Sequence, residues 1–335
     1  MFPRKAKRWL LAAILIGVVA AWGILSLRPK ETPLLPHARR VAAINGAYPF
    51  YWWVSEQEFL YFRDPARQDW TLVRRNLKTG NETPLAALTQ LFRTSGGKPE
   101  TAQISPEGTW LLWTGARGDT FVSTLDGSRH FQTPSHGPAE KRWLLDGFRW
   151  VEILNDGTDF SQAIFHTVDS PKELKYKPIT PLLPSDPNTL NVSSMMITPD
   201  GHLMTNFWNG GAGKIGPARV IAADFTASPS RIGKFVLPAP HECDRGDLVF
   251  SPTGDYAVWV LEYGQPLAAL LGGRKTTGFW VIGRDSLASY ELGSVETARD
   301  GRSGPLAVRW LPDGAHISFV YNNALWVIPA YGKQE

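Results

Sequence analysis

The sequence predicts an all-β protein, a six-bladed β-propeller of four-stranded blades, preceded by one N-terminal transmembrane helix. Three observations lead to this prediction. A proline–glycine turn motif recurs along the chain, aromatic residues alternate after the turns, and an apolar run without charges stands near the N-terminus. The 335 residues include 14 tryptophans, 31 glycines and 26 prolines, a composition typical of many short strands and tight turns.

Residues 9–27 form an uninterrupted run of 19 residues without a charged side chain. At about 1.5 Å per residue, a helix of this length spans roughly 28 Å, close to the hydrocarbon thickness of a bilayer. The run is longer than the apolar region of a cleaved signal peptide, and it ends without a small-x-small cleavage site. We therefore expect an uncleaved signal-anchor, with a cleaved signal peptide as the alternative.

The basic residues around this run set its orientation and the domain limits. Arg4, Lys5, Lys7 and Arg8 precede it, so the positive-inside rule makes residues 1–8 a cytoplasmic stub. Residues 28–36 contain three prolines and are expected to form a short stiff linker. The propeller domain would then cover residues 37–335 and lie in the periplasm or outside the cell, on a single-pass protein of the cytoplasmic membrane.

A self-similar turn identifies the blades. Its clearest copy is the segment 104–113, in which Pro106 fixes φ at the first corner and Gly108 supplies a positive φ. The glycine of this turn, or its equivalent, stands at Glu58, Gly108, Gly147, Gly201, Gly254 and Gly314. This spacing gives six repeats, and a seventh blade hidden in an interval such as 254–314 is the alternative.

Each repeat continues as strands. Residues three and five positions after the turn share one face of a strand, and at five positions stand the large aromatics Trp113, Trp259 and Phe319. A third strand follows in every repeat, and a more polar fourth strand follows most of them. The third strands are expected at 70–73, 121–122, 160–165, 220–221, 279–282 and 325–328. Four strands per repeat make a propeller blade.

These turn-and-strand units resemble the WD40-like repeats of the TolB family of β-propellers. The copy at 104–127, which ends in Leu125-Asp126-Gly127, is the most similar to that pattern. The resemblance covers about residues 45–335 and implies the fold. It implies little about function, because such propellers support many activities. This chain departs from TolB itself. The resemblance implies for TolB a soluble periplasmic protein with an extra α/β domain before its propeller, whereas this chain has the apolar run at that place.

The two ends of the propeller domain are expected to meet. The last repeat has three strands, and a three-stranded blade would leave an open edge and a gap in the ring. Residues 39–44 precede the first blade and are strand-like. We therefore predict that they pair with Leu325–Ile328 as the missing outer strand.

Loop lengths predict the binding face. Connections between the first and second strands are tight turns, whereas long connections occur between the second and third strands and between blades. The long connections are 84–100, 178–191, 209–217, 238–247 and 264–278. Loops on a rigid scaffold are usual sites of recognition. In the last of them, Leu267, Leu270 and Leu271 form an apolar segment that either contacts a protein or peptide partner or packs onto neighbouring blades.

The sequence contains no recognisable catalytic motif, and no cofactor is expected. No nucleophile elbow, zinc-protease helix or P-loop is present. The residues Gly211–Gly216 match a dinucleotide pattern but lie between strands, so we interpret them as a hairpin loop. His241, Glu242 and Asp244, next to the single cysteine Cys243, are weak candidates for metal binding, because four consecutive loop residues rarely reach one metal.

The charge distribution excludes nucleic acid as a partner. The formal net charge is +4, but the first 30 residues hold six basic residues and no acid, so the remainder has a net charge of −2. The expected function is a non-catalytic scaffold for a protein or another ligand. The alternative is a propeller hydrolase or lyase acting on peptides or glycans at the central mouth. An acidic or histidine cluster on the axis would favour the enzyme.

Overall fold

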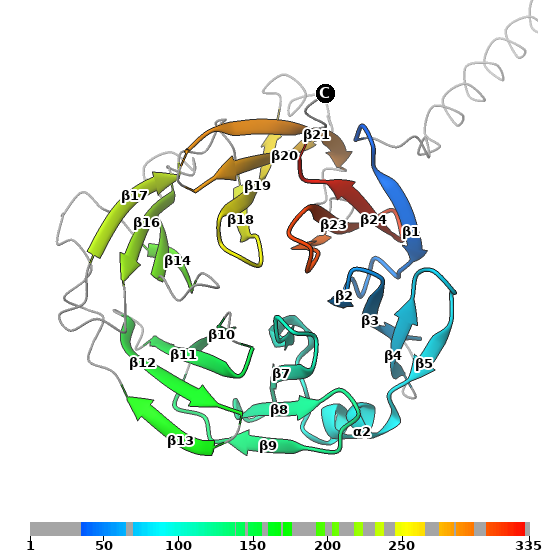
Figure 1. Ribbon diagram of the computed structural model, residues 1–335, viewed down its shortest axis with the longest axis vertical. Coiled ribbons are helices and arrows are strands. Elements are labelled where there is room, and N and C mark those ends of the chain that lie inside the picture. Colours follow the sequence, from blue (N-terminus) through cyan, green and yellow to red (C-terminus); the bar gives the residue numbers. More distant parts are fainter. Residues whose placement is uncertain are drawn as a thin grey trace, which may run out of the picture. The chain divides into compact units, whose positions relative to one another are not determined.

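A computed structural model of the protein describes residues 35–331, except 65–69, 138, 145–146, 156–159, 169, 176–191, 198–202, 208–217, 224–231, 238–244, 265–274, 285 and 298–305. The described strands form six antiparallel sheets of four strands each. The sheets follow one another around a ring in chain order, as expected for a β-propeller (Figure 1). Four-stranded blades in an all-β propeller are therefore confirmed.

The blades are numbered here in chain order. Blade 1 contains β2 (Tyr51–Ser55), β3 (Glu58–Arg63), β4 (Thr71–Asn76) and β5 (Glu82–Pro84). Blade 2 contains β6 (Gln103–Ile104), β7 (Trp110–Thr114), β8 (Thr120–Thr124) and β9 (His130–Thr133). Blade 3 contains β10 (Ala139–Trp143), β11 (Arg149–Asn155), β12 (Phe160–Thr167) and β13 (Ser170–Lys175).

The second half of the ring repeats this order. Blade 4 contains β14 (Val192–Ile197), β15 (Leu203–Phe207), β16 (Ala218–Ala223) and β17 (Ile232–Leu237). Blade 5 contains β18 (Arg245–Phe250), β19 (Tyr256–Gly264), β20 (Lys275–Gly283) and β21 (Ser289–Thr297). Blade 6 contains β22 (Leu306–Trp310), β23 (His316–Tyr321), β24 (Ala324–Pro329) and β1 (Arg39–Ala43).

The predicted closure of the ring by the two chain ends is confirmed. Strand β1 pairs antiparallel with β24, and Arg39 lies opposite Val327 while Ala43 lies opposite Ala324. Ala42 is buried against the neighbouring blades, whereas Ala43 is exposed. The segment that follows the linker in sequence is thus the outer strand of the last blade. Leu35, at the end of that linker, is also buried.

The core lies between adjacent blades, where the alternating side chains of facing sheets meet. Residues three and five positions after a turn face the preceding blade, so that Ile317 and Phe319 of blade 6 pack against Val258 and Val281 of blade 5. The same rule places Trp150 of blade 3 against the side chains of blade 2. The aromatic period-two pattern of the sequence therefore produces the contacts between blades.

Two of the expected long connections are partly regular structure. Segment 84–100 contains helix α2 (Ala86–Thr94), which the sequence analysis missed, followed by the short 3₁₀ helix η1 (Pro99–Thr101). Leu88 and Phe92 of α2 are buried between blades 1 and 2. In blade 5 the expected loop 264–278 is shorter, because β20 already begins at Lys275, which lies opposite Gly264. Apolar burial and continued strand pairing override the loop-like composition there.

Within the described part of the chain, which starts at residue 35, no helix is both long and apolar enough to cross a membrane. The predicted stub 1–8 and transmembrane helix 9–27 lie outside the described residues. Between turn glycines 254 and 314, every described strand belongs to blade 5 or blade 6, so none of them forms a further blade.

Candidate functional site

Blade 3 replaces three apolar core positions by polar residues. Glu152 stands five positions after its turn, where blades 2, 5 and 6 have Trp113, Trp259 and Phe319. Lys141, directly opposite Glu152 on β10, takes the place that Leu248 has in blade 5. His166, opposite Trp150 on β12, takes the place of Ile282 and Ile328. The repeat geometry therefore brings an acid, an amine and an imidazole into one space between blades 2 and 3.

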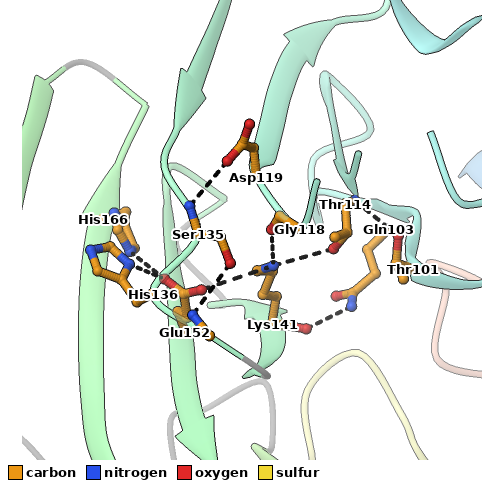
Figure 2. A network of polar contacts seen from close by, with 11 residues as sticks. Thr101, Gln103, Thr114, Gly118, Asp119, Ser135, His136, Lys141, Glu152 and His166 are labelled. Atoms are coloured by element: carbon orange, nitrogen blue, oxygen red, sulfur yellow. Dashed lines mark hydrogen bonds and ion pairs between the residues drawn. The ribbon is translucent and has the colours of Figure 1, made fainter. Parts of the chain in front are cut away.

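Glu152 is the centre of this cluster (Figure 2). Its side chain is fully buried. His136, in the connection between β9 and β10, donates from Nδ1 to Oε2 of Glu152 at 3.0 Å. Nε2 of His166 lies 3.5 Å from the same oxygen, and Nζ of Lys141 lies 3.9 Å from Oε1. One carboxylate thus faces three basic side chains.

These neighbours keep Glu152 ionised. Burial by itself raises the pKa of a carboxyl group, because it disfavours the charged form. The imidazoles of His166 and His136 and the charge of Lys141 outweigh that effect, so the pKa of Glu152 lies below its usual value. Burial lowers the pKa of the Lys141 amine, and the charge of Glu152 partly compensates for this. The charge of Lys141 is therefore supported by Glu152, whereas the charge of Glu152 is supported first by the two histidines and then by Lys141.

The cluster also ties blade 3 to blade 2. Nζ of Lys141 donates to Oγ1 of Thr114 at 3.2 Å and lies 3.4 Å from the carbonyl oxygen of Gly118. Gln103 of blade 2 donates from Nε2 to the carbonyl oxygen of Lys141 at 2.6 Å. Figure 2 shows these contacts on both sides of the gap between the blades. The tripeptide Arg117-Gly118-Asp119 lies in the turn between β7 and β8.

His166 lies flat on an indole. Its ring stacks on Trp150 with centroids 3.9 Å apart and an interplanar angle of 7°. Neither of its ring nitrogens has an aligned hydrogen bond within the described residues, and Nε2 approaches Glu152 without one. The other strand histidine, His316, differs from His166, because its Nδ1 lies 2.6 Å from Oδ2 of the nearby Asp313.

Chemically, the cluster combines a buried acid, Glu152, with two buried bases, Lys141 and His166, and a partly exposed base, His136. Glu152 has no exposed surface, so a substrate does not reach it in this conformation. Within the described residues, no group of three or more histidine, cysteine or acidic side chains is arranged to hold a metal ion. The arrangement fits a buried ion network that fixes the contact between two blades.

The axis of the ring carries a different chemistry. The first strands of the blades lie innermost (Figure 1). One level of the ring is marked by the penultimate residue of each first strand, and in the strands with described side chains these are Val54, Gln103, Arg142, Val249 and Arg309. Val54 is buried and the other four are half-buried. These five include neither an acid nor a histidine, the residue types that would favour the enzyme alternative.

A hollow of about 520 Å³ lies on the side of the short turns, between blades 1 and 2. Two of its charged side chains, Arg74 and Asp126, already have partners, whereas Glu107 is exposed. Arg74 binds Glu58, and a hydrogen bond from Thr124, together with those from Ser128, lowers the pKa of Asp126 to about 2. Arg74 and Asp126 are therefore not available as unpaired charges for a ligand.

The residues singled out by the sequence analysis lie outside the described residues. These are the metal candidates His241, Glu242 and Asp244, the neighbouring Cys243, and the partner candidates Leu267, Leu270 and Leu271. The signal that identifies Glu152 was present in the sequence, because the turn frame that found Trp113 and Trp259 places Glu152 at the same position. Its meaning depends on Lys141 and His166, which only the strand register brings beside it.

Comparison with solved structures supports the fold. A protein assigned as TolB from Agrobacterium tumefaciens superposes with a TM-score of 0.50 at 14% sequence identity, over 84% of this chain and 91% of that chain. The oligogalacturonate lyase of Vibrio parahaemolyticus superposes with a TM-score of 0.51 at 12% identity, over 91% of this chain and 93% of that chain.

At these identities the likeness establishes the fold alone. The chain has the β-propeller fold found in TolB-type proteins, which confirms the resemblance of its repeats. No protein-family model matches the chain, and no curated protein matches it in sequence.

Proposed function

We propose that the protein is a membrane-anchored, extracytoplasmic β-propeller that acts as a non-catalytic scaffold for binding a protein or another ligand. The observation that carries the proposal is the complete burial of Glu152. The acid and base groups of the Glu152 cluster hold blade 2 against blade 3. Together with the pairing of β1 and β24, they produce a rigid ring that can present loops.

The partner is assigned to the face with the long connections. The apolar residues Leu267, Leu270 and Leu271 stand in sequence between β19 and β20, and we propose that they contact a protein or peptide. An apolar segment in a connection is the type of surface that recognition uses. The competing reading, in which the segment packs onto its own blades, predicts a stability change instead of a binding change.

The partner test is a pull-down from detergent-solubilised membranes, comparing the wild-type chain with Leu270→Asp. Leu287→Asp is the matched control, because Leu287 is an exposed leucine between β20 and β21 of the same blade. We expect Leu270→Asp to lose a partner that Leu287→Asp retains, with melting temperatures unchanged in both. A large drop in the melting temperature of Leu270→Asp would place the segment in the core and refute the patch.

The membrane location rests on the charge-free run 9–27 and the basic residues before it. We propose a single-pass protein of the cytoplasmic membrane with the N-terminus inside and the propeller in the periplasm or outside the cell. Intact-mass measurement of the membrane-bound protein tests the anchor. A mature N-terminus beyond Ser26 would show that the run is a cleaved signal peptide.

A further inference from the structure

The exposed large apolar and aromatic side chains lie mostly on one face of the ring. At this face, called the short-turn face, the first strand of each blade turns into the second and the third turns into the fourth. Six such side chains are exposed among the described residues, and five of them lie in these turns or near the strand ends beside them: Phe148, Tyr256, Leu287, Tyr290 and Tyr331. The sixth, Tyr48, lies on the opposite face, where the chain passes from β1 to β2.

Four of the five belong to the adjacent blades 5 and 6 (Figure 1). Tyr256 meets Tyr331 edge to face, with ring centroids 5.0 Å apart. The hydroxyl of Tyr290 donates to the carbonyl oxygen of Ala330, and that of Tyr331 donates to the carbonyl oxygen of Gly314 at 3.1 Å. Because both hydroxyls have acceptors inside the protein, covering these rings would leave neither donor unpaired.

The chain enters the ring from the same side. Strand β1 is antiparallel to β24, and Ala43 at the end of β1 lies opposite Ala324, where β24 begins at the opposite face. Strand β1 therefore runs away from the short-turn face. Leu35, four residues before β1, is 1% exposed and belongs to the core cluster between blades 5 and 6. The entering chain is thus fixed to the two blades that carry the exposed tyrosines.

The sequence holds this side close to the proposed membrane anchor. Residues 28–34 separate the charge-free run from Leu35, and a chain of this length extends at most about 25 Å. Strand β19 of blade 5 has nine residues, so at about 3.3 Å per residue the two faces are roughly 30 Å apart there. The linker is therefore shorter than the blade is tall, which favours contact with the bilayer through the short-turn face. Tyrosine is enriched at membrane–water interfaces.

We propose that the short-turn face of blades 5 and 6 rests on the bilayer surface, with Tyr256, Leu287, Tyr290 and Tyr331 among the lipid headgroups. The inference rests on the proposed membrane anchor and adds an orientation to it, because the face with the long connections then points away from the membrane. Charges of both signs stand beside the tyrosines, as in the ion pair of Arg284 with Asp255 at 3.7 Å. The contact is therefore assigned to apolar and aromatic groups and does not require anionic lipid.

The test places a fluorescent label on either face of the full-length protein in phosphatidylcholine vesicles. Cys243→Ser removes the single native cysteine, and Ala288→Cys or Ala47→Cys then provides the labelling site. The two alanines are a matched pair, because both are exposed and each adjoins an exposed large side chain, Leu287 or Tyr48. The vesicles contain lipid with a spin label on its headgroup, which quenches a fluorophore at the membrane surface.

The label at position 288 should lose about half or more of its fluorescence, and the label at position 47 should lose little, because the faces are roughly 30 Å apart. Adding Leu287→Asp should relieve much of the quenching at position 288, since a charge disfavours contact with lipid. Tyr48→Asp, the matched change on the opposite face, should leave it unchanged. Unchanged quenching in a folded Leu287→Asp protein would overturn the assignment of the contact to these side chains.

Flotation of the same samples with the vesicles reports the anchor alone. Protein that floats but is quenched equally at both positions would overturn the face contact and leave the anchor standing. Protein that does not float would overturn the anchor and the face contact with it. A disulfide-linked pair of unlabelled Ala288→Cys chains, without a difference in quenching between the two positions, would assign the face to a second copy of the chain and overturn the lipid contact.

Discussion

Neutralising Glu152 should lower the free energy of unfolding of the ring more than neutralising an exposed charge does. In Glu152→Gln the negative charge that faces Lys141, His136 and His166 is lost, while Lys141, only 7% exposed, stays between the blades. Removing one member of a buried ion pair typically costs about 3–5 kcal/mol, because the remaining charge has no compensation. We expect a loss of this size in the free energy of unfolding, measured by urea denaturation of the solubilised protein.

The double variant Lys141→Met with Glu152→Met separates the charge effect from a packing effect. It restores the apolar character that Leu248 and Trp259 give to the same positions in blade 5. Replacing both charges by apolar side chains is often neutral or stabilising by about 1–4 kcal/mol. The double variant should therefore recover most of the stability that Glu152→Gln loses. Glu107→Gln, an exposed acid on the turn of blade 2, should change stability by less than about 0.5 kcal/mol.

The pH dependence provides an independent check on the same residue. The pKa of Glu152 is lowered in the folded protein. The ionised carboxylate therefore contributes its full stabilisation above the unfolded-state pKa of about 4.3. This stabilisation is lost as the pH falls below that value towards the folded-state pKa. The stability difference between the wild type and Glu152→Gln should then shrink from pH 6 towards pH 3. A constant difference over that range, or a loss in Glu152→Gln below about 1 kcal/mol at pH 7, would refute the ion-network interpretation.

Three further variants test the ring. Ala42→Asp, which buries a charge where β1 meets β24, should cost more than about 2 kcal/mol of unfolding free energy, whereas the exposed Ala43→Asp should cost little; equal losses would contradict the closure. Ser318→Ala should cost about 1–3 kcal/mol in urea melts, because Trp53 Nε1 and the Tyr51 hydroxyl both bond to Ser318 Oγ, and an unchanged midpoint would argue against that contact between blades 6 and 1. Gly108→Ala should lower the melting temperature more than Gly80→Ala. Both glycines have a positive φ, but only at Gly108 would an added Cβ approach a backbone oxygen, that of Val54, at 2.2 Å. The reverse order of melting temperatures would contradict this packing.

The repeat pattern was sufficient to predict much of the fold. Each turn glycine indicates a position that needs a positive φ, and the apolar residues after it alternate with a period of two, as in a strand. Both signals can be found within about ten residues of sequence. The closing strand β1 followed from counting the strands of the last repeat. Helix α2 was missed because Leu88 and Phe92 are explained only by the gap between blades 1 and 2 that they fill.

The polar cluster around Glu152 was harder to predict because it depends on several chain segments. Glu152 becomes significant only beside Lys141 and His166, which the strand register places there. A single strand shows only an isolated charged or polar residue.

The central claim, binding without catalysis, is tested most directly by the fate of a captured partner. The full-length chain would be purified from membranes with its partner, and the intact mass of the partner would be followed during incubation with the chain. The account predicts a fixed ratio of partner to propeller and an unchanged partner mass. A partner that is cleaved or modified over time by the wild-type chain would contradict it and would favour the hydrolase or lyase alternative.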